Sequence, residues 1–401
     1  MKKVILGIGL VFVAVIGIIA IRLSRDPNAP RYEPIKGSVK LPPGVQVHYD
    51  FLNPDPFADG KMWIYVHTTN EWHNYLFDID RRQVLGEFFG QQPLFTMRGG
   101  GKFVCSARVP ESKFSFLRGQ IFEALSGLMV GKSQATRQRH ELVTFWSIDL
   151  QGHSAKKMGE VIQSTSRAHV YPSPDRQFAF TSSSASTKNE EIILFNLDRE
   201  SSETHVVPGN PFGWWDDANI VVHTPSTELM LYNVKTRSQS LLLGSTQLET
   251  FFETVGLTNA PQQSWPFLQW NGTNNVLYLT EGNKRWSAEE SYLIRIEHPD
   301  GRPKLVSKSF KFEWSDHFDR TGTKYLYSGR LAGTNSDAVI VRDLATGTTN
   351  TLVPTLGEKY FSIPQFYKDT VIYIRSNALW QVSLKTSNIT RLFPVQDSGA
   401  H

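Results

Sequence analysis

The sequence predicts an all-β fold, a β-propeller of seven blades, and two observations carry this prediction. A turn followed by two alternating strands recurs after residue 45, most clearly over 171–198, with looser copies from Phe212, Phe267 and Lys311. A unit repeated every 40–50 residues or so is typical of propellers and solenoids. Apolar and polar residues also alternate between turn residues, as in half-buried strands. Six or eight blades are the alternatives.

Four strands per blade can be assigned along the chain. The first blade has strands near Gln46 and over 62–67, 74–78 and 83–88, and the second has strands at 94–98, 103–107, 143–149 and near Lys157. The other five blades follow as whole segments: 170–207, 212–243, 267–309, 311–353 and 361–393. The domain order is therefore a propeller over 45–393 with a tail at 394–401.

The N-terminal segment differs in kind from the repeats. Lys2 and Lys3 precede an apolar run over 4–21, which Arg22 ends. This run approaches the length needed to cross a bilayer and exceeds the apolar part of most cleaved signal peptides. We therefore expect residues 1–22 to be an uncleaved signal anchor, contacting the membrane through 4–22. Residues 23–44 contain five prolines and are expected to be an extended tether.

Composition excludes several classes of function. The net charge of +4 is spread along the chain, so no nucleic-acid surface is expected. Cys105 is the only cysteine, which excludes an internal disulfide and a thiolate zinc cluster. It lies in an apolar strand, so a buried thiol is expected. The histidines show no metal-binding spacing, and we expect no cofactor and no metal.

The stretch Ser173-Pro174-Asp175-Arg176 with Ala179-Phe180 resembles the propeller repeat of the TolB type, which prolyl oligopeptidases also contain. Arg176 stands where this repeat usually has glycine. The resemblance implies a fold rather than an activity, because a peptidase would need an α/β-hydrolase domain with a nucleophile elbow. No Gly-x-Ser-x-Gly motif is present in the sequence.

The strand assignment also predicts which face carries function. Connections between the second and third strands of a blade, and links between blades, emerge on one face. The long ones are all of these kinds: 108–142, 182–189, 244–266, 281–290 and 331–336. Long loops on a rigid scaffold are where binding sites concentrate.

Two of these insertions have helical patterns. Within the insertion at 112–139, an apolar stripe suits a membrane or partner contact, or packing on the propeller itself. The stripe consists of Phe114, Leu117, Ile121, Leu125 and Leu128. A second helix is expected over 246–256, with a capping box of Thr246 and Glu249, a stop at Gly256, and local packing as its role.

Two groups of tryptophans have different expected roles. Trp214, Trp270 and Trp314 recur at the end of the innermost strand, so we expect them to pack between blades. The loop tryptophans and their charged neighbours are the candidate binding residues, since exposed aromatics commonly anchor recognition sites. The candidates are Glu71, Trp72, His73, Trp265, Lys284, Arg285 and Trp286.

Catalytic signals are weaker than binding signals. Glu313, Asp316 and Asp319 could form an acid/base pair, but aspartates are also ordinary turn residues in such repeats. We therefore predict a non-enzymatic binding or scaffold module, outside the cytoplasm and in the cell envelope, whose partner is another envelope protein. The alternative is a propeller hydrolase or lyase acting on a glycan or small molecule.

Overall fold

A computed structural model describes the chain over most of the predicted propeller. The described residues are 29–36, 39, 46–49, 60–67, 71–89, 92–108, 141–151, 154–163, 170–183, 190–224, 226, 228–256, 264–270, 275–281, 291–310, 317–319, 321–330, 337–353 and 364–393. The predicted anchor, the insertion at 112–139 and the tail lie outside them. Within the described part, no helix is both long and apolar enough to cross a bilayer.

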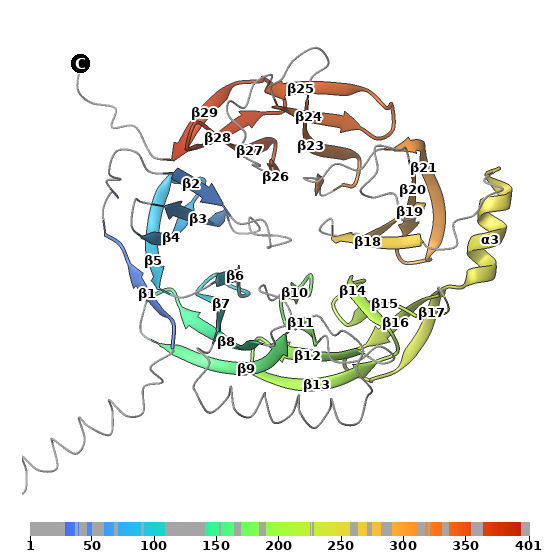
Figure 1. Cartoon of the computed structure of the whole chain (residues 1–401), viewed down its shortest axis with the longest axis horizontal. Coiled ribbons are helices and arrows are strands. Elements are labelled where there is room, and N and C mark those ends of the chain that lie inside the picture. The colour runs from blue at the N-terminus through green and yellow to red at the C-terminus, as the bar shows by residue number, and fades with distance from the viewer. Residues whose placement is uncertain are drawn as a thin grey trace, which may run out of the picture.

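The described strands form seven antiparallel sheets, six with four strands and one with five. Figure 1 shows the sheets arranged in a ring, in chain order, around a common centre. This arrangement confirms the prediction of an all-β propeller fold. We number the sheets one to seven along the chain.

In sheet order, innermost strand first, the elements are as follows. Sheet one contains β2 (Gln46–Tyr49), β3 (Lys61–His67), β4 (Trp72–Asp78), β5 (Gln83–Phe89) and, outermost, β1 (Arg31–Pro34). Sheet two contains β6 (Gln92–Thr96), β7 (Lys102–Arg108), β8 (Glu141–Asp149) and β9 (Ala155–Gln163), and sheet three contains β10 (Tyr171–Pro172), β11 (Phe178–Ser183), β12 (Glu190–Asn196) and β13 (Ser201–Val207). Sheet four contains β14 (Asn210–Trp214), β15 (Asn219–His223), β16 (Leu229–Asn233) and β17 (Gln239–Leu243), and sheet five contains β18 (Ser264–Trp270), β19 (Asn275–Glu281), β20 (Ser291–Glu297) and β21 (Arg302–Phe310). Sheet six contains β22 (His317–Phe318), β23 (Lys324–Arg330), β24 (Asp337–Asp343) and β25 (Thr349–Val353), and sheet seven contains β26 (Gln365–Tyr367), β27 (Thr370–Arg375), β28 (Ala378–Ser383) and β29 (Ile389–Phe393).

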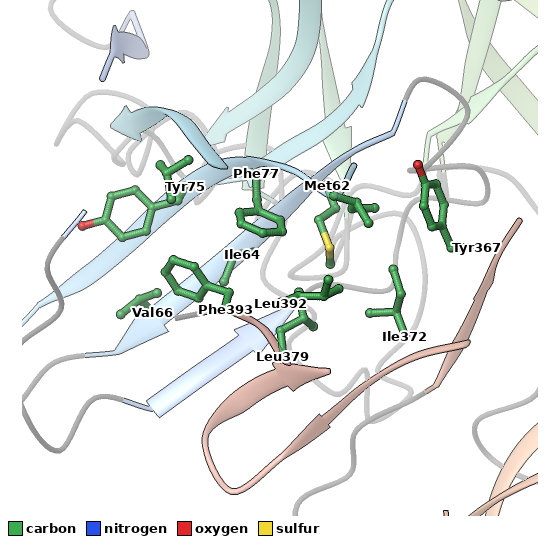
Figure 2. Close-up of a cluster of buried hydrophobic side chains, with 12 residues drawn as sticks. Met62, Ile64, Val66, Tyr75, Phe77, Tyr367, Ile372, Leu379, Leu392 and Phe393 are labelled. Carbon is green, nitrogen blue, oxygen red and sulfur yellow. The ribbon is translucent and has the colours of Figure 1, made fainter. Parts of the chain in front are cut away.

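Among the described strands, no sheet combines strands from the two ends of the chain. All strands of sheet one precede residue 90, and all strands of sheet seven follow residue 364. The two sheets meet through apolar side chains, with Ile64 and Phe77 from sheet one facing Leu379 and Phe393 from sheet seven (Figure 2). We call this cluster the closing seam. Its full membership is Met62, Ile64, Val66, Tyr75, Phe77, Ile79, Val84, Tyr367, Ile372, Leu379, Leu392 and Phe393.

Polar contacts reinforce the closing seam at one edge. Lys368 Nζ lies 2.8 Å from Asp80 Oδ2, which joins the turns of sheets seven and one. The hydrogen bonds from Lys368 and Tyr367 hold the pKa of the Asp80 carboxyl below its usual value. Because both members of the ion pair are more than half exposed, the apolar cluster is the main source of stability at this junction.

One strand extends sheet one beyond the predicted four. β1 pairs antiparallel with β5, with Arg31 opposite Phe89 and Pro34 opposite Gly86. Figure 1 shows it on the outside of the ring. The segment predicted as an extended tether over 23–44 therefore includes a strand, because the backbone groups of β1 pair with the outer edge of β5.

The two ends of the sheets differ in their connections. We call the end with the links between sheets the loop face and the opposite end the turn face. As predicted, the long connection between β7 and β8 belongs to the loop face. The prediction that all long connections lie there is wrong for residues 50–60, which separate β2 from β3 at the turn face.

The turns between the third and fourth strands share one backbone conformation. In six sheets a residue one or two positions before the fourth strand has a positive φ, between 50° and 72°. These residues are Arg82, Glu200, Arg237, Gly301, Gly347 and Ser387. A side chain at the start of the turn also stabilises it. In sheet six, for example, Asp343 Oδ1 accepts hydrogen bonds from the backbone N–H groups of Ala345 and Thr346. Four non-glycine residues thus adopt a conformation that favours glycine.

The predicted second helix is present as α3 (Ser245–Thr254), within the link between sheets four and five. Its cap differs from the predicted one: Gln247 Oε1 accepts a hydrogen bond from the backbone N–H of Gly244 at 2.9 Å. Gly256 follows the helix with a φ of +75°, as expected of a stop. Phe252 is buried against sheets four and five, which confirms local packing as the role of this helix.

Candidate binding patch on sheet one

The predicted residues Glu71, Trp72 and His73 lie together at the loop face of sheet one, where β4 begins. Trp72 is the first residue of β4 and is paired with His67, the last residue of β3. The prediction placed Trp72 in the loop before the strand, so the strand starts two residues earlier than expected. This position holds the backbone of Trp72 in a hydrogen-bonded ladder while leaving its side chain at the rim.

Trp72 is the most exposed large hydrophobic residue in the described part of the chain, at 62%. Its ring centroid lies 4.3 Å from that of His67, with 34° between the ring planes. The histidine ring therefore supports the indole on one side. An indole ordered in this way can contact a ligand with little further loss of side-chain entropy.

The side chain of His73 lies on the face of sheet one opposite to Trp72, where it contacts two acidic residues. Its Nδ1 lies 2.7 Å from Glu87 Oε1 on β5, and its Nε2 lies 3.8 Å from Glu71 Oε2. The imidazole also stacks on Tyr75 at 5.9 Å, with only 4° between the planes. Burial, together with the charge of Glu87, raises the pKa of Tyr75 to about 12, so its hydroxyl stays protonated at neutral pH.

These contacts define what we call the Trp72 patch: His67, Glu71, Trp72, His73 and Glu87. It combines one exposed aromatic ring, two imidazoles and two carboxylates at the rim of one sheet. Such a set can stack on an apolar or sugar ring, donate hydrogen bonds from imidazole and accept them with carboxylate.

Of the other predicted binding residues, Trp265 is the one that the structure describes, and it does not lie in this patch. Trp265 lies in β18, opposite Thr280, rather than in a loop as predicted. Figure 1 shows β4 and β18 on opposite sides of the ring. Lys284, Arg285 and Trp286 lie outside the described residues, as does the apolar stripe at Phe114, Leu117, Ile121, Leu125 and Leu128.

The scaffold role predicted for the repeated tryptophans is confirmed at Trp214. It is 3% exposed, and its Nε1 donates a hydrogen bond to the backbone oxygen of Tyr171 in the preceding sheet at 2.7 Å. Trp270 ends β18, at the position that Trp214 has in β14. Trp314 lies outside the described residues.

Two members of the patch were not predicted from the sequence. His67 and Glu87 lie five residues before Trp72 and fourteen residues after His73, so nothing in their spacing links them to the tryptophan. The strand register is the signal that finds them, because it places His67 opposite Trp72 and brings Glu87 across from Tyr75.

Of the three candidate acid/base residues, the structure describes Asp319, whereas Glu313 and Asp316 lie outside the described residues. Asp319 Oδ1 accepts hydrogen bonds from the backbone N–H groups of Thr323 and Lys324, both at 2.8 Å, as a turn aspartate does. Cys105 is fully buried, which raises the pKa of its thiol, and this confirms the predicted buried thiol. Within the described ranges, no cluster of three or more histidine, cysteine or acidic residues could hold a metal ion.

Arg176, at the position where the TolB-type repeat usually has glycine, has a φ of +57°. This positive φ explains why the repeat usually has glycine here, because glycine adopts it without steric strain. The arginine instead extends into the junction with sheet two, where its Nη1 donates to the hydroxyl of Thr96 at 3.0 Å and also to the Thr96 backbone oxygen. These hydrogen bonds offset the backbone strain of a side chain in this region.

Comparisons with known proteins give information on the fold alone. No family model matches the chain, and no curated protein matches its sequence. Among solved structures, the β-propeller domain of the Trilobed protease from Pyrococcus furiosus, described as having an open velcro topology, aligns with a TM-score of 0.52 at 12% identity, covering 84% of this chain and 96% of that one.

Two oligogalacturonate lyase structures are also similar. The enzyme from Vibrio parahaemolyticus has a TM-score of 0.51 at 9% identity, covering 86% of this chain and 93% of that one. An oligogalacturonate lyase in complex with manganese has a TM-score of 0.50 at 11% identity, covering 83% and 87%. These similarities confirm at the level of fold that this chain is a β-propeller of the kind that the TolB-type repeat implies.

Proposed function

We propose that this chain is a membrane-anchored, seven-bladed β-propeller that binds an envelope protein through its loop face, outside the cytoplasm and without catalysing a reaction. The anchor at residues 1–22 and the location rest on the sequence. The observation that carries the binding function is the exposed Trp72 at the rim of sheet one.

Exposure of this tryptophan is costly, which supports a role in binding. A fully buried aromatic side chain contributes roughly 1.5–3 kcal/mol relative to an exposed one, and this contribution is not gained at Trp72. Tryptophan is also the residue type most enriched among the energetic anchors of interfaces. The neighbouring carboxylates and imidazoles supply the polar rim that usually surrounds such an anchor.

The test compares Trp72→Ala with Leu241→Ala in the full-length protein. Leu241 lies on the outer strand β17 and is 53% exposed, so it is a matched control for loss of an exposed apolar side chain far from the patch. Each variant is crosslinked in envelope membranes and its captured proteins are identified.

We expect Trp72→Ala to lose a captured protein that wild type and Leu241→Ala both retain. An anchor in an interface should weaken binding by about 2 kcal/mol or more, which is roughly 30-fold in Kd. Identical capture by all three proteins would contradict the assignment of the patch.

The alternative is a hydrolase or lyase acting on a glycan or small molecule. The observation that favours it is the hydrogen-bonded pair of His73 and Glu87, which lies at the same rim as the exposed Trp72 but on the opposite face of sheet one. Imidazole and carboxylate are common proton-transfer groups, and indoles stack on sugar rings. Turnover of a panel of acidic and neutral oligosaccharides by wild type, lost in Glu87→Gln, would establish this alternative and overturn the proposed binding module.

A further inference from the structure

The described residues 29–36 and 39 pack into the apolar clusters on both sides of sheet one. Ala29 and Tyr32 pack into the apolar cluster between sheets one and two, whereas Ile35 and Val39 pack against the closing seam between sheets one and seven. β1 joins these contacts along the outer edge of β5. The segment therefore crosses the outside of sheet one from one neighbouring sheet to the other.

Tyr32 is the anchor of this segment. It is 4% exposed, and its ring meets that of Phe103 in sheet two edge-on at 5.6 Å. Burial raises the pKa of its hydroxyl to about 12. Gly86 on β5 makes room for it, because a Cβ at Gly86 would lie 2.2 Å from Tyr32 Oη and 2.7 Å from the backbone oxygen of Glu33.

Further contacts fix the ends of the segment. The guanidinium of Arg31 lies 4.4 Å from the ring centroid of Phe89, at the loop-face end of β5. The backbone N–H of Ile35 continues the ladder past β1 by donating to Leu85 O at 2.9 Å. The segment thus starts at the loop face, within the same sheet as the Trp72 patch.

From these contacts we propose that residues 29–36, continued by the contact of Val39, form a strap that fixes the loop face close to the N-terminal anchor and so restricts the Trp72 patch to partners near the bilayer. The proposal rests on the membrane anchor of the proposed function. Between Arg22 and Ala29 the chain has seven residue steps and spans at most about 25 Å, at ~3.5 Å per step. Without the strap, the span from Arg22 to Gln46 would reach about 80 Å on the same basis.

Two variants with inserted linkers distinguish a strap that is docked on sheet one from a free tether. A Gly-Ser linker of about 20 residues, with an end-to-end distance near 25 Å, is placed after Pro27 in one variant and after Pro43 in the other. Full-length protein is reconstituted in vesicles containing acceptor-labelled lipids. Donor dyes are attached at Ser376→Cys on the loop face or at Thr386→Cys on the turn face, since Cys105 is buried.

We expect energy transfer to the lipids to be stronger from position 376 than from position 386. The linker after Pro27 lowers transfer from position 376, because it lies between the anchor and the strap. The linker after Pro43 leaves transfer unchanged, because it lies beyond the strap. Tyr32→Ala releases the strap and makes the linker after Pro43 lower transfer as well.

Equal losses of transfer from the two linkers in the otherwise wild-type protein would overturn the strap. Failure of the proposed anchor gives a different result, in which the full-length protein does not associate with the vesicles and no variant shows transfer. A change in unfolding midpoint on Tyr32→Ala in detergent tests the packing of the strap independently of the membrane, and no change there would also contradict it.

Discussion

The closing seam should contribute as much stability as a junction inside the ring, although no strand crosses it. Phe77 and Phe393 meet there at 5.6 Å with 65° between their planes, and both are at most 2% exposed. Phe145 and Phe195, at the junction of sheets two and three, meet at 4.9 Å and are fully buried. The two pairs have the same chemistry and nearly the same burial.

Truncation of a fully buried phenylalanine to alanine costs about 3–5 kcal/mol, from lost transfer free energy and the cavity left behind. We therefore expect Phe77→Ala and Phe145→Ala to destabilise the protein by similar amounts. The edge-to-face contact of Phe77 with Phe393 adds a coupling of roughly 0.5–1.5 kcal/mol within that pair, and the rings of Phe145 and Phe195 are tilted at 56° in a similarly close contact. A double-mutant cycle over Phe77 and Phe393 should recover that coupling.

The assay is urea unfolding followed by far-UV circular dichroism. The free energy of unfolding is extrapolated for wild type, for the single variants at Phe77, Phe393 and Phe145, and for the double variant at Phe77 and Phe393. A cost below about 1 kcal/mol for Phe77→Ala, alongside the full 3–5 kcal/mol for Phe145→Ala, would refute the reasoning. Sheets one and seven would then not be packed against each other in solution.

Three other predictions concern the turns, one partly buried carboxylate and the thiol. Ser387→Gly should raise the free energy of unfolding by up to about 1 kcal/mol, because Ser387 has a φ of +57°; an unchanged or lower value would contradict the strained turn. Burial alone would raise the pKa of Glu200, but hydrogen bonds from Lys102, Ser147 and Lys156 outweigh it and hold the pKa below its usual value. Glu200 therefore stabilises the fold above its unfolded pKa of about 4.5, and this contribution is lost as the pH falls through the lower folded pKa. Glu200→Gln should cost about 1–3 kcal/mol at pH 7 and much less at pH 3, and an equal cost at both pH values would exclude a charge effect. Cys105 should react with a thiol reagent only after unfolding, because it is fully buried with a raised pKa; rapid labelling of the native protein would contradict this.

The propeller fold could be predicted from the sequence, but the additional strand β1 and the shared turn conformation could not. Strand alternation and repeated turns, such as Ser173 to Asp175, are local signals, so the repeated groups of strands could be found. β1 has no such signal, since its four residues bury only Tyr32 and depend on the space left by Gly86. The turns between third and fourth strands share a backbone conformation that arginine, glutamate, serine and glycine all adopt, so no common residue reveals it.

The candidate site was predicted only in part for the same reason. Trp72 and His73 could be chosen from their residue types, whereas His67 and Glu87 became neighbours only through strand register. Trp265 was grouped with them because its segment was assigned to a link, but the strand begins at Ser264, one residue earlier. A shift of two or three residues at the start of a strand is enough to move a tryptophan from a predicted loop into a strand.

The contiguity of the sheets has a consequence for how the protein can be made. Every sheet is complete once its own stretch of chain has been synthesised, and even β1 finds its partner β5 within the first 89 residues. Propellers that close with a strand from each end must instead keep one sheet unfinished until synthesis stops. Here each sheet can fold on the ribosome and dock on the one before it. For the described strands, the long-range event that remains is the packing of sheet seven against sheet one, which requires no exchange of strands.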